Sequence, residues 1–575
     1  MPNGSVIDLH GAWRFRHDAE DVGCAQGWQR NAVDAAWESV EIPQAWDAYE
    51  WDDRRGPAWF ARRFSASWNF GESVAVFIHG VDASARVWLN GEALHANQSH
   101  GLRRGFDASA SIRRGASVLC IRVARHGGPG GILRSVRVAA PRDDAAFLAG
   151  ECHGRSPRPS ADWVRDAVIY QVYLRSFSNQ GTIAGLIERL DELKELGATL
   201  LWLMPIHPVG RERRKGSLGS PYAVRDYYGV NSEFGSLDDL RVLIDQVHSR
   251  GMRIILDVVL NHTAWDCPLV REHPDWFKHN AAGEIVPPNP GWTDVAALDY
   301  AKRDVRRYME DVLAYWAGDV GVDGFRCDVA GLIPLDFWEA ARTRLDAIKS
   351  ILMLAEDDAP AGHLTAFDLT YDWQTYALLE RFAAGCVRPA WIADMLLDET
   401  LEFPAASLRM RFTSNHDKCA WIQPALVRYG PAGAKAAAVL SFALPGVPLI
   451  YNGQEVGNTT PLPLFERVAI DWTRDEHDMH GLYKRLASLR STHEAFRRGK
   501  VRVFDTRGAP SLLALERSAP IQRAIVLINF SCDALELESS LPALVGVSPR
   551  IASDGARVDA RRVRLPGFGF WIGVS

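Results

Sequence analysis

The chain has 575 residues, of which 24% are charged and 47% hydrophobic, and its formal net charge is −6. This composition is ordinary for a globular protein of three or four domains, and it lacks the basic excess of a nucleic-acid-binding protein. The chain has 20 Trp residues, and indole rings stack on sugars as well as filling hydrophobic cores, so a carbohydrate is one possible binding partner.

The first eight residues, Met1–Asp8, contain neither a basic segment nor an apolar one. We therefore expect no signal peptide and a cytoplasmic protein. There is no run of about 18 apolar residues, so no membrane partner is expected. The 8 Cys residues lack CxxC or CxxH spacing, which favours free thiols over disulfides or a zinc site.

Residues 1–143 carry short strand-like runs separated by turns. One of them, Val87–Leu89, leads into Asn90-Gly91, the strongest short hairpin signal. Strands at this spacing predict an antiparallel β-sandwich. Residues 144–161, with Ser156-Pro157-Arg158-Pro159-Ser160, read as a linker because Pro, Ser and charged residues are concentrated there.

Several segments of this first domain resemble the N-terminal sugar-binding jelly-roll domain of β-galactosidases and β-glucuronidases. They are Leu9–Phe15, Ile42–Trp46, Trp59–Phe64, Val87–Glu92 and Gly131–Arg134. The resemblance implies a galactose-binding-like jelly-roll fold. It does not imply β-galactosidase activity, because the segment that follows is of another kind. We expect its Trp residues to pack in the core. A role in forming a homodimer, or in narrowing a substrate cleft, is a hypothesis from its placement.

Strand-like and helix-like runs alternate over residues 162–490, which predicts parallel strands joined by helical crossovers. The apolar spacing of Leu186–Leu196 predicts a helix ended by Gly197, and Ser236 is expected to cap another that stops at Gly251. The pattern indicates a (β/α)8 barrel with insertions. Its eight strands are expected at 168–174, 199–204, 253–259, 324–327, 353–356, 367–370, 410–413 and 447–451.

The stretch Gly324–Asp328 reads as a short buried strand ending in a carboxylate. Strand side chains alternate, so Arg326 and Asp328 share a face, where the guanidinium favours the ionised carboxylate. An ionised, oriented carboxylate at a strand end suits a nucleophile in glycosyl transfer. The alternative for this stretch alone is a structural Arg–Asp pair.

Other polar residues follow neighbouring strands: Asp257 and His262 the third, Glu356 the fifth, and His416-Asp417 the seventh. In a barrel of this kind the carboxyl ends of all strands meet at one rim, where the chemistry takes place. Carboxylates and histidines at the ends of several strands are hard to explain as buried polar groups that only satisfy hydrogen bonds within the core. They indicate an active site.

The same segments resemble the α-amylase family, glycoside hydrolase family 13, over about residues 162–490. The matching segments are Asp257–His262, Gly324–Asp328, Glu356, Phe412–Asp417, Ser220–Tyr228 and Gly446–Glu455. The resemblance implies a retaining double displacement with Asp328 as nucleophile, Glu356 as acid and base, and Asp417 as the third acid. It also implies sugar binding by Tyr222, His262, Arg326 and His416, and an Asp257 that braces Arg326. We expect neighbouring carboxylates to raise the pKa of Glu356.

Three features depart from, or extend, the family pattern. The run Val329-Ala330-Gly331-Leu332 lacks the Lys-His pair of many endo-acting amylases, which argues against plain endo action on starch. Residues 262–300 resemble the family's inserted subdomain, with Trp265, Trp276, Phe277 and Trp292 as candidate platforms for sugar rings. The charged run Arg211–Ser217 is expected to be a solvated rim loop.

No cofactor is required by these residues. Asn261 matches a position that binds structural calcium in many amylases, so a calcium ion is an open alternative there. Residues 491–575 turn β-rich again and resemble the family's C-terminal antiparallel domain.

The sequence thus predicts an enzyme that hydrolyses α-1,4 bonds of malto-oligosaccharides or small dextrins. One alternative is transglycosylation on the same residues, with a sugar hydroxyl replacing water, and another is action on α-1,6 bonds. A third is a catalytically inactive carbohydrate-binding protein, although such proteins lose the carboxylates that this chain keeps.

Overall fold

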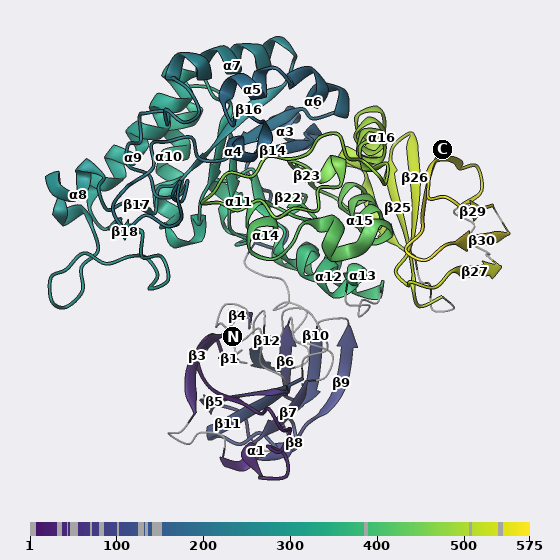
Figure 1. The fold of residues 1–575 in the computed structure, drawn as a ribbon. Coiled ribbons are helices and arrows are strands. Elements are labelled where there is room, and N and C mark those ends of the chain that lie inside the picture. Colours follow the sequence, from purple (N-terminus) through teal and green to yellow (C-terminus); the bar gives the residue numbers. More distant parts are fainter. Residues whose placement is uncertain are drawn as a thin grey trace. The chain divides into compact units, whose positions relative to one another are not determined.

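A computed structural model gives the fold (Figure 1). It describes residues 7–575 apart from 32–36, 43, 46–55, 70–71, 80–84, 101–102, 125–130, 133–135, 141–151, 384–388, 505, 507–508, 539–543 and 560. The chain divides into two compact units: Met1–His153 with Ala377–Glu402, and Gly154–Tyr376 with Phe403–Ser575. In the described part of the chain, no helix combines the length and apolarity needed to cross a membrane.

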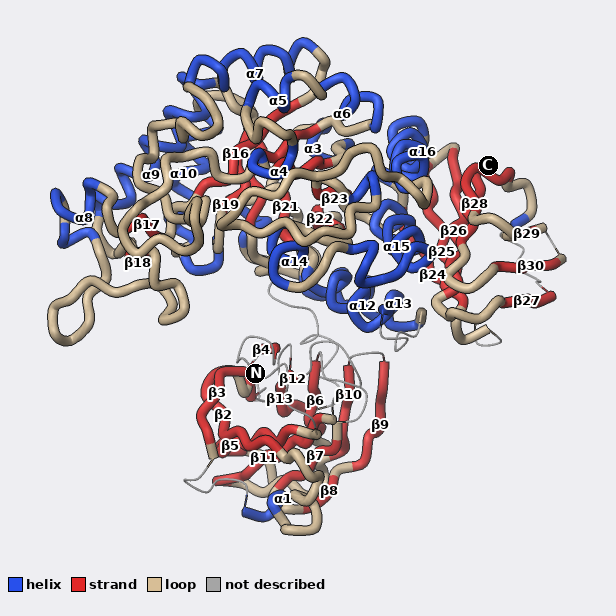
Figure 2. Tube along the Cα trace, in the orientation of Figure 1, coloured by secondary structure: helices blue, strands red, loops and turns tan. Residues whose placement is uncertain are grey.

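The first unit consists mainly of two antiparallel sheets (Figure 2). One has the order β1-β13-β6-β10-β9 and the other β3-β2-β5-β11-β7-β8, with β12 and β4 paired separately. Buried side chains of both sheets, among them Val76 and Phe60, share one core, which confirms the predicted β-sandwich. The bounds are β1 Ile7–Asp8, β2 Gly11–His17, α1 Trp28–Asn31, β3 Glu38–Ile42, β4 Gln44–Ala45, β5 Ala58–Ala66, β6 Ala75–His79, β7 Arg86–Leu89, β8 Glu92–Ala93, β9 His95–His100, β10 Arg103–Asp107, β11 Gly115–Val123, β12 Gly131–Ile132, β13 Val136–Ala139 and α13 Ala390–Glu402.

The predicted hairpin joins β7 to β8. Asn90 and Gly91 both have positive φ, 55° and 84°, as a type I′ turn requires. Beside it, four indoles pack together and are buried: Trp28, Trp37, Trp59 and Trp88. These Trp residues therefore serve the core. The resemblance of this unit to a β-galactosidase-type domain stays a prediction.

The second unit contains the closed eight-stranded parallel barrel, in the order β14-β15-β16-β19-β20-β21-β22-β23, and so confirms the predicted fold class. Its strands are almost wholly buried on both faces because the barrel fills one side and helices cover the other. They are β14 Ile169–Val172, β15 Leu200–Leu203, β16 Arg253–Val258, β19 Gly324–Cys327, β20 Leu352–Ala355, β21 Leu369–Tyr371, β22 Leu408–Arg411 and β23 Val447–Tyr451.

Strand β22 begins two residues earlier than predicted. The strand thus includes Arg409, which is buried and donates a 2.6 Å hydrogen bond to the Tyr371 carbonyl. The helix expected over Leu186–Leu196 is also different. It is broken into α5 and α6, because Arg189 has a non-helical backbone between them. Ser236 caps α7 as predicted, in a reciprocal capping box with Asp239.

The helices of the second unit surround the barrel (Figure 1). They are α3 Asp162–Asp166, α4 Leu174–Phe177, α5 Ile183–Ile187, α6 Leu190–Leu196, α7 Leu237–Ser249, α8 Pro268–Glu272, α9 Arg303–Tyr315, α10 Leu335–Asp346, α11 Gly362–Thr365, α14 His416–Trp421, α15 Ala425–Ala443, α16 Met479–Thr492 and α17 Glu494–Arg498, with the short turns η2 Pro274–Trp276, η3 Trp316–Val320, η4 Ala330–Leu332 and η5 Gln454–Val456. The division between the two units falls after Tyr376, within helix α12, Trp373–Ala383.

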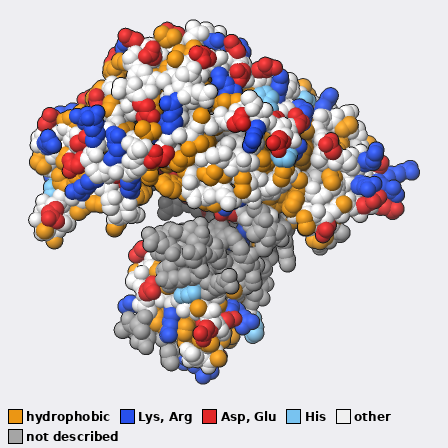
Figure 3. Space-filling model, viewed as in Figure 1, with side chains coloured by type: hydrophobic (Ala, Val, Ile, Leu, Met, Phe, Trp, Pro, Cys, Tyr) orange, Lys and Arg blue, Asp and Glu red, His pale blue; other side chains and the backbone are white. Residues whose placement is uncertain are grey.

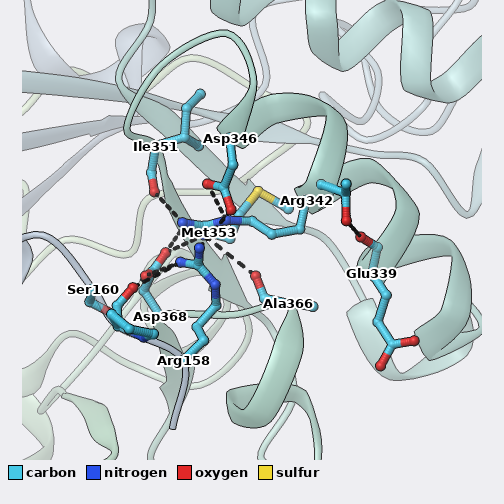
Figure 4. Close-up of polar contacts among 11 residues, drawn as sticks. Arg158, Ser160, Glu339, Arg342, Asp346, Ile351, Met353, Ala366 and Asp368 are labelled. Carbon is cyan, nitrogen blue, oxygen red and sulfur yellow. Dashed lines mark hydrogen bonds and ion pairs between the residues drawn. The ribbon is translucent and has the colours of Figure 1, made fainter.

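The amino-terminal ends of β20 and β21 are held by a buried charge network around Asp368 (Figure 4). Its side chain is fully buried and accepts bonds from Arg342 at 2.6 Å, Ser160 at 2.6 Å and Arg158 at 3.2 Å. It also accepts the backbone N–H of Met353 at 2.8 Å. Arg158 and Ser160 belong to the predicted linker, so this stretch is docked against the barrel at the end opposite the predicted active-site residues.

Two further parts extend the barrel. The strands β17 His262–Ala264 and β18 Val295–Ala297 pair in the segment inserted after β16. The C-terminal sheets contain β24 Lys500–Val503, β25 Leu512–Ala519, β26 Gln522–Asn529, β27 Leu535–Glu538, β28 Ser548–Ala552, β29 Arg557–Val558, β30 Arg562–Leu565 and β31 Phe570–Val574, paired antiparallel as predicted. On the face of this unit seen in Figure 3, acidic and basic side chains are interspersed.

Candidate active site

The guanidinium of Arg326 lies at the centre of the site. It is fully buried on β19 and contacts three carboxyl groups, each at 2.8 Å: Asp257 and Asp328 through Nη1, and Glu356 through Nη2. The strand alternation predicted the contact with Asp328, and the predicted bracing of Arg326 by Asp257 is present. The structure therefore brings residues from the third, fourth and fifth barrel strands around one positive charge.

One guanidinium cannot neutralise three carboxylates, so at least one of these carboxyls is favoured in its protonated form. Burial raises the pKa of Glu356 to about 8, and the negative charges of Asp328 and Asp417 add to this effect against the opposing pull of Arg326. The side chain of Glu356 is 14% exposed, so it reaches the cavity while remaining poorly hydrated. The raised pKa was expected, but its main cause is burial and not the neighbouring carboxylates.

Val329 holds Glu356 from the backbone. Its N–H donates to Glu356 Oε2 at 2.8 Å. To do so it adopts φ 39° and ψ 48°, a left-handed conformation that is strained for a β-branched side chain. Such strain costs about 1–3 kcal/mol and concentrates at functional sites. Nothing in the sequence identifies this amide as part of the site.

His416 is held neutral in a buried chain of hydrogen bonds. Burial lowers the pKa of its imidazole to about 4. Its Nδ1 lies 2.8 Å from Gln171 Nε2, and its Nε2 lies 2.6 Å from the Tyr222 hydroxyl, which donates to Asp257 at 3.2 Å. The Gln171 amide donates to Nδ1, which leaves the ring proton on Nε2. Gln171, on β14, was not predicted, because a glutamine inside a buried strand carries no motif of its own.

Asp417 stands in the first turn of α14, not on the barrel strand that precedes it. Asn415 caps this helix by accepting the Lys418 N–H at 2.9 Å. The cap fixes the turn that carries both His416 and Asp417, whose Nε2 and Oδ2 lie 3.5 Å apart. The Asp417 side chain is 32% exposed, the most accessible of the predicted acids.

His262 opens β17 and is buried, which lowers the pKa of its imidazole. Its Nδ1 lies 3.3 Å from the amide nitrogen of Asn261, and its ring packs on Trp292 at 5.5 Å. Among the described residues, no group of three or more His, Cys, Asp or Glu side chains is arranged to hold a metal ion. Calcium at Asn261 stays a prediction, and no chemical step depends on it.

All seven predicted catalytic and substrate-binding side chains line one cavity of about 200 Å³. They are Tyr222, His262, Arg326, Asp328, Glu356, His416 and Asp417. Of the four aromatic candidates in the inserted segment, Trp292 also lines it, whereas Phe277 is buried in the subdomain. Residues not predicted complete the lining: Lys215, Ser220, Asp294, Val295, Val329, Trp421, Leu464 and Phe465.

A closed parallel barrel with three carboxyl groups around one arginine, at the carboxyl ends of its strands, places the candidate active site where barrel enzymes have theirs. Comparison with known proteins gives the family. Residues 169–284 match the model of the alpha amylase catalytic domain. A crystal structure of an alpha-amylase from Lactobacillus plantarum superposes with a TM-score of 0.63 at 30% identity, covering 72% of this chain and all of that one. The chain belongs to the α-amylase family.

Two curated relatives extend this similarity. Alpha-amylase MalA of Haloarcula japonica is 29% identical over 403 residues, which is 66% of this chain but only 57% of that protein's length. A cyclomaltodextrinase of Geobacillus thermopakistaniensis is 26% identical over 490 residues, covering 75% of this chain and 81% of the relative. Both alignments are longer than the segment that the family model matches.

Proposed function

We propose that this enzyme hydrolyses α-1,4-glucosidic bonds of malto-oligosaccharides or small dextrins with retention of configuration. One observation carries the proposal: Arg326 holds Asp328 and Glu356 side by side, and burial keeps Glu356 protonated near neutral pH. The substrate class follows from the named relatives, an alpha-amylase and a cyclomaltodextrinase.

In the first step, an Asp328 oxygen attacks the anomeric carbon while Glu356 gives its proton to the glycosidic oxygen. The bond from that carbon to the leaving oxygen breaks, the shortened sugar leaves as an alcohol, and the glycone becomes an ester of Asp328. Retention requires carboxyl groups about 5–5.5 Å apart, with both acids flanking the scissile bond.

In the second step, the ionised Glu356 takes a proton from water, and the resulting hydroxide oxygen attacks the same carbon. The ester bond to Asp328 breaks, the free sugar leaves with its original configuration, and Glu356 is protonated again. The hydrogen bond from the Val329 backbone N–H keeps the Glu356 carboxyl in place through both steps.

The remaining polar groups bind the reacting sugar. Asp417 accepts bonds from its hydroxyls, and it is accessible enough to do so. His262 and His416 are neutral at physiological pH, and their rings form part of the wall against the sugar; the Nε2 proton of His416 is already donated to the Tyr222 hydroxyl. Tyr222 supplies an aromatic face for the ring, braced by its own stacking on His416 at 5.5 Å.

A transglycosylase would use the same residues and differ only in the acceptor at the second step. An α-1,6-acting enzyme would differ in how the leaving sugar is held. A product profile on maltotriose, panose, cyclodextrin and starch separates these possibilities, because panose carries both linkages and transfer yields products longer than the donor.

The test of the proposal is hydrolysis of maltotriose followed by proton NMR of the freshly released reducing end. We expect α-anomer first, and loss of at least about 10³-fold in kcat for Asp328→Asn, because the nucleophile is removed. Glu212→Gln, an exposed change outside the cavity, serves as control. Initial β-anomer, or an Asp328→Asn variant with normal turnover, would contradict the mechanism.

A further inference from the structure

A charged segment crosses one side of the catalytic cavity. Residues 210–219, here called the strap, follow β15 and contain the run that the sequence suggested was solvated. The strap begins beside a bridge between Val209 and Val224, with Gly210 N–H bonded to the Ala223 carbonyl at 2.9 Å. Most of its side chains are exposed, but Lys215 turns inward and lines the cavity.

On one side the strap is fastened to the inserted segment. Lys215 Nζ lies 2.9 Å from Asp294 Oδ1 and donates to the Gly291 carbonyl at 2.9 Å. The guanidinium of Arg213 lies 3.9 Å over the ring of Trp265. These contacts combine an ion pair, a hydrogen bond and a cation–π contact, so the attachment is made at several points.

On the other side the strap is fastened to the segment that follows β23. Ser217 N–H donates to Glu466 Oε1 at 2.8 Å, and Leu218 N–H donates to the Phe465 carbonyl at 2.9 Å. The buried Arg175 then joins both partners, because its Nη1 donates to the carbonyls of Gly219 at 2.7 Å and Leu464 at 2.9 Å.

The ion pair of Lys215 and Asp294 is part of the cavity wall itself. Both residues line the cavity, and the Asp294 side chain is only 7% exposed. A carboxylate this buried requires a partner, which Lys215 provides. Most side chains of the strap are exposed as expected, but the strap is also fastened on both sides and so connects the inserted segment to the segment after β23.

The position of this wall identifies the end of the substrate that it faces. The strap and the segment after β23 follow β15 and β23, the two neighbours of β14, and the inserted segment follows β16, the strand after β15. Glu356 follows β20, the fourth strand from β14 in either direction round the barrel. The leaving sugar departs on the side of the acid that protonates it, so the wall stands on the glycone side.

We infer that the strap closes the glycone end of the site, so that the enzyme accepts α-glucan chains by their non-reducing ends. Lys215 and Asp294 then determine how far the terminal sugars enter. This inference rests on the proposed function, and it adds a direction of attack and the residues that impose it.

The experiment uses two linear maltoheptaosides with the same p-nitrophenyl reducing end. One has a free non-reducing glucose, and the other carries a 4,6-O-ethylidene group there. Loss of each starting compound is followed by chromatography with the full-length enzyme. We expect the blocked compound to be consumed about 10–200-fold more slowly, the discrimination that one or two extra carbons meet in a closed pocket.

Variants assign this selectivity to the wall. Lys215→Ala and the nearly isosteric Asp294→Asn should bring the two rates at least severalfold closer together, whereas Glu212→Ala, an exposed charge on the same strap, should leave their ratio unchanged. Melting curves report whether each variant is folded. If Lys215→Ala does not fold, Asp294→Asn provides the test on its own. Equal consumption of both compounds by the native enzyme would overturn the inference and leave the proposed function standing. Consumption of neither would overturn both.

Discussion

The two ends of the barrel both contain buried arginine–carboxylate networks, but their charges are balanced differently. At the amino-terminal end, Asp368 lies between Arg158 and Arg342, and Asp346 also contacts both arginines, so two carboxylates meet two guanidinium groups. At the carboxyl end, Arg326 alone meets three carboxyl groups.

This difference separates a structural network from a reactive one. A balanced network has no group that needs to change its protonation state, and it fixes the linker and two strands. At the carboxyl end, burial raises the pKa of Asp257 to about 7 and that of Glu356 to about 8, and of these two only Glu356 lines the cavity. Substitutions at the two ends should therefore affect different properties.

The largest effect is expected for Glu356→Gln, which removes the proton that the unbalanced end supplies. We expect kcat on maltotriose to fall about 10²–10⁴-fold, the usual contribution of general acid–base catalysis. Melting temperature should not fall, because an uncharged amide replaces a carboxyl that burial disfavours as an anion. With α-glucosyl fluoride, whose leaving group needs little protonation, the first step should be largely restored. An equal loss on both substrates would indicate misplacement of the nucleophile instead.

The balanced end should respond in stability and not in catalysis. Asp368→Asn leaves Arg158 and Arg342 without their shared buried counter-charge, which should cost about 3–5 kcal/mol of unfolding free energy. Urea denaturation measures this loss, and kcat at a temperature where the variant is folded should match the native value. Glu339→Gln, which alters a nearby bond to Thr365 at the surface, is the control and should cost less than about 1 kcal/mol. A normal stability for Asp368→Asn would remove the distinction between the two ends.

The pH profile examines the proton on Glu356 directly. The acid must be protonated in the free enzyme, so kcat/KM should stay level below its pKa and fall about tenfold per pH unit above about 8. An ordinary glutamic acid, with a pKa near 4.3, would place this limb far lower. Stopped-time assays from pH 5 to pH 10 locate the limb, and its absence in Glu356→Gln would assign it. A limb below pH 6 would show that the surroundings of Glu356 do not raise its pKa to about 8.

The smallest effect concerns the strained backbone of Val329. Val329→Gly relieves a conformation that a β-branched residue resists, at the expense of a more flexible unfolded chain, and the net change should be a gain of about 1 kcal/mol in stability. A glycine backbone holds the N–H that donates to Glu356 less firmly, so kcat should fall severalfold. Val329→Ala keeps a Cβ atom in the same conformation and serves as the comparison. A destabilised glycine variant would show that the strain is not stored at this position.

The sequence was sufficient for the parts of the molecule that depend on local pattern. Buried apolar runs such as Leu200–Leu203 and helix caps such as Ser236 are set by residues close together in the chain. They therefore predicted the barrel elements to within a few residues. The acids at strand ends followed from the barrel order together with the family resemblance.

The parts that the sequence did not reveal depend on contacts between distant segments. The strand expected at 410–413 begins at Leu408, and the buried Arg409 within it has its hydrogen-bond partner, the Tyr371 carbonyl, 38 residues away in the sequence. The role of Lys215 depends on Asp294, a residue of another loop, and a run of charges has no feature that separates a solvated loop from a fastened one. The amide of Val329 is invisible in the sequence because every residue except proline has one.

The position of Arg326 between Asp328 and Glu356 has a consequence for the whole reaction cycle. In the proposed mechanism, Asp328 loses its negative charge when it becomes an ester, and in the same step Glu356 acquires one by releasing its proton. The charge thus moves from the partner of Nη1 to the partner of Nη2, and the total around the guanidinium is the same before and after. The surrounding protein does not have to repolarise between the two half-reactions, so a single fixed cation can serve both.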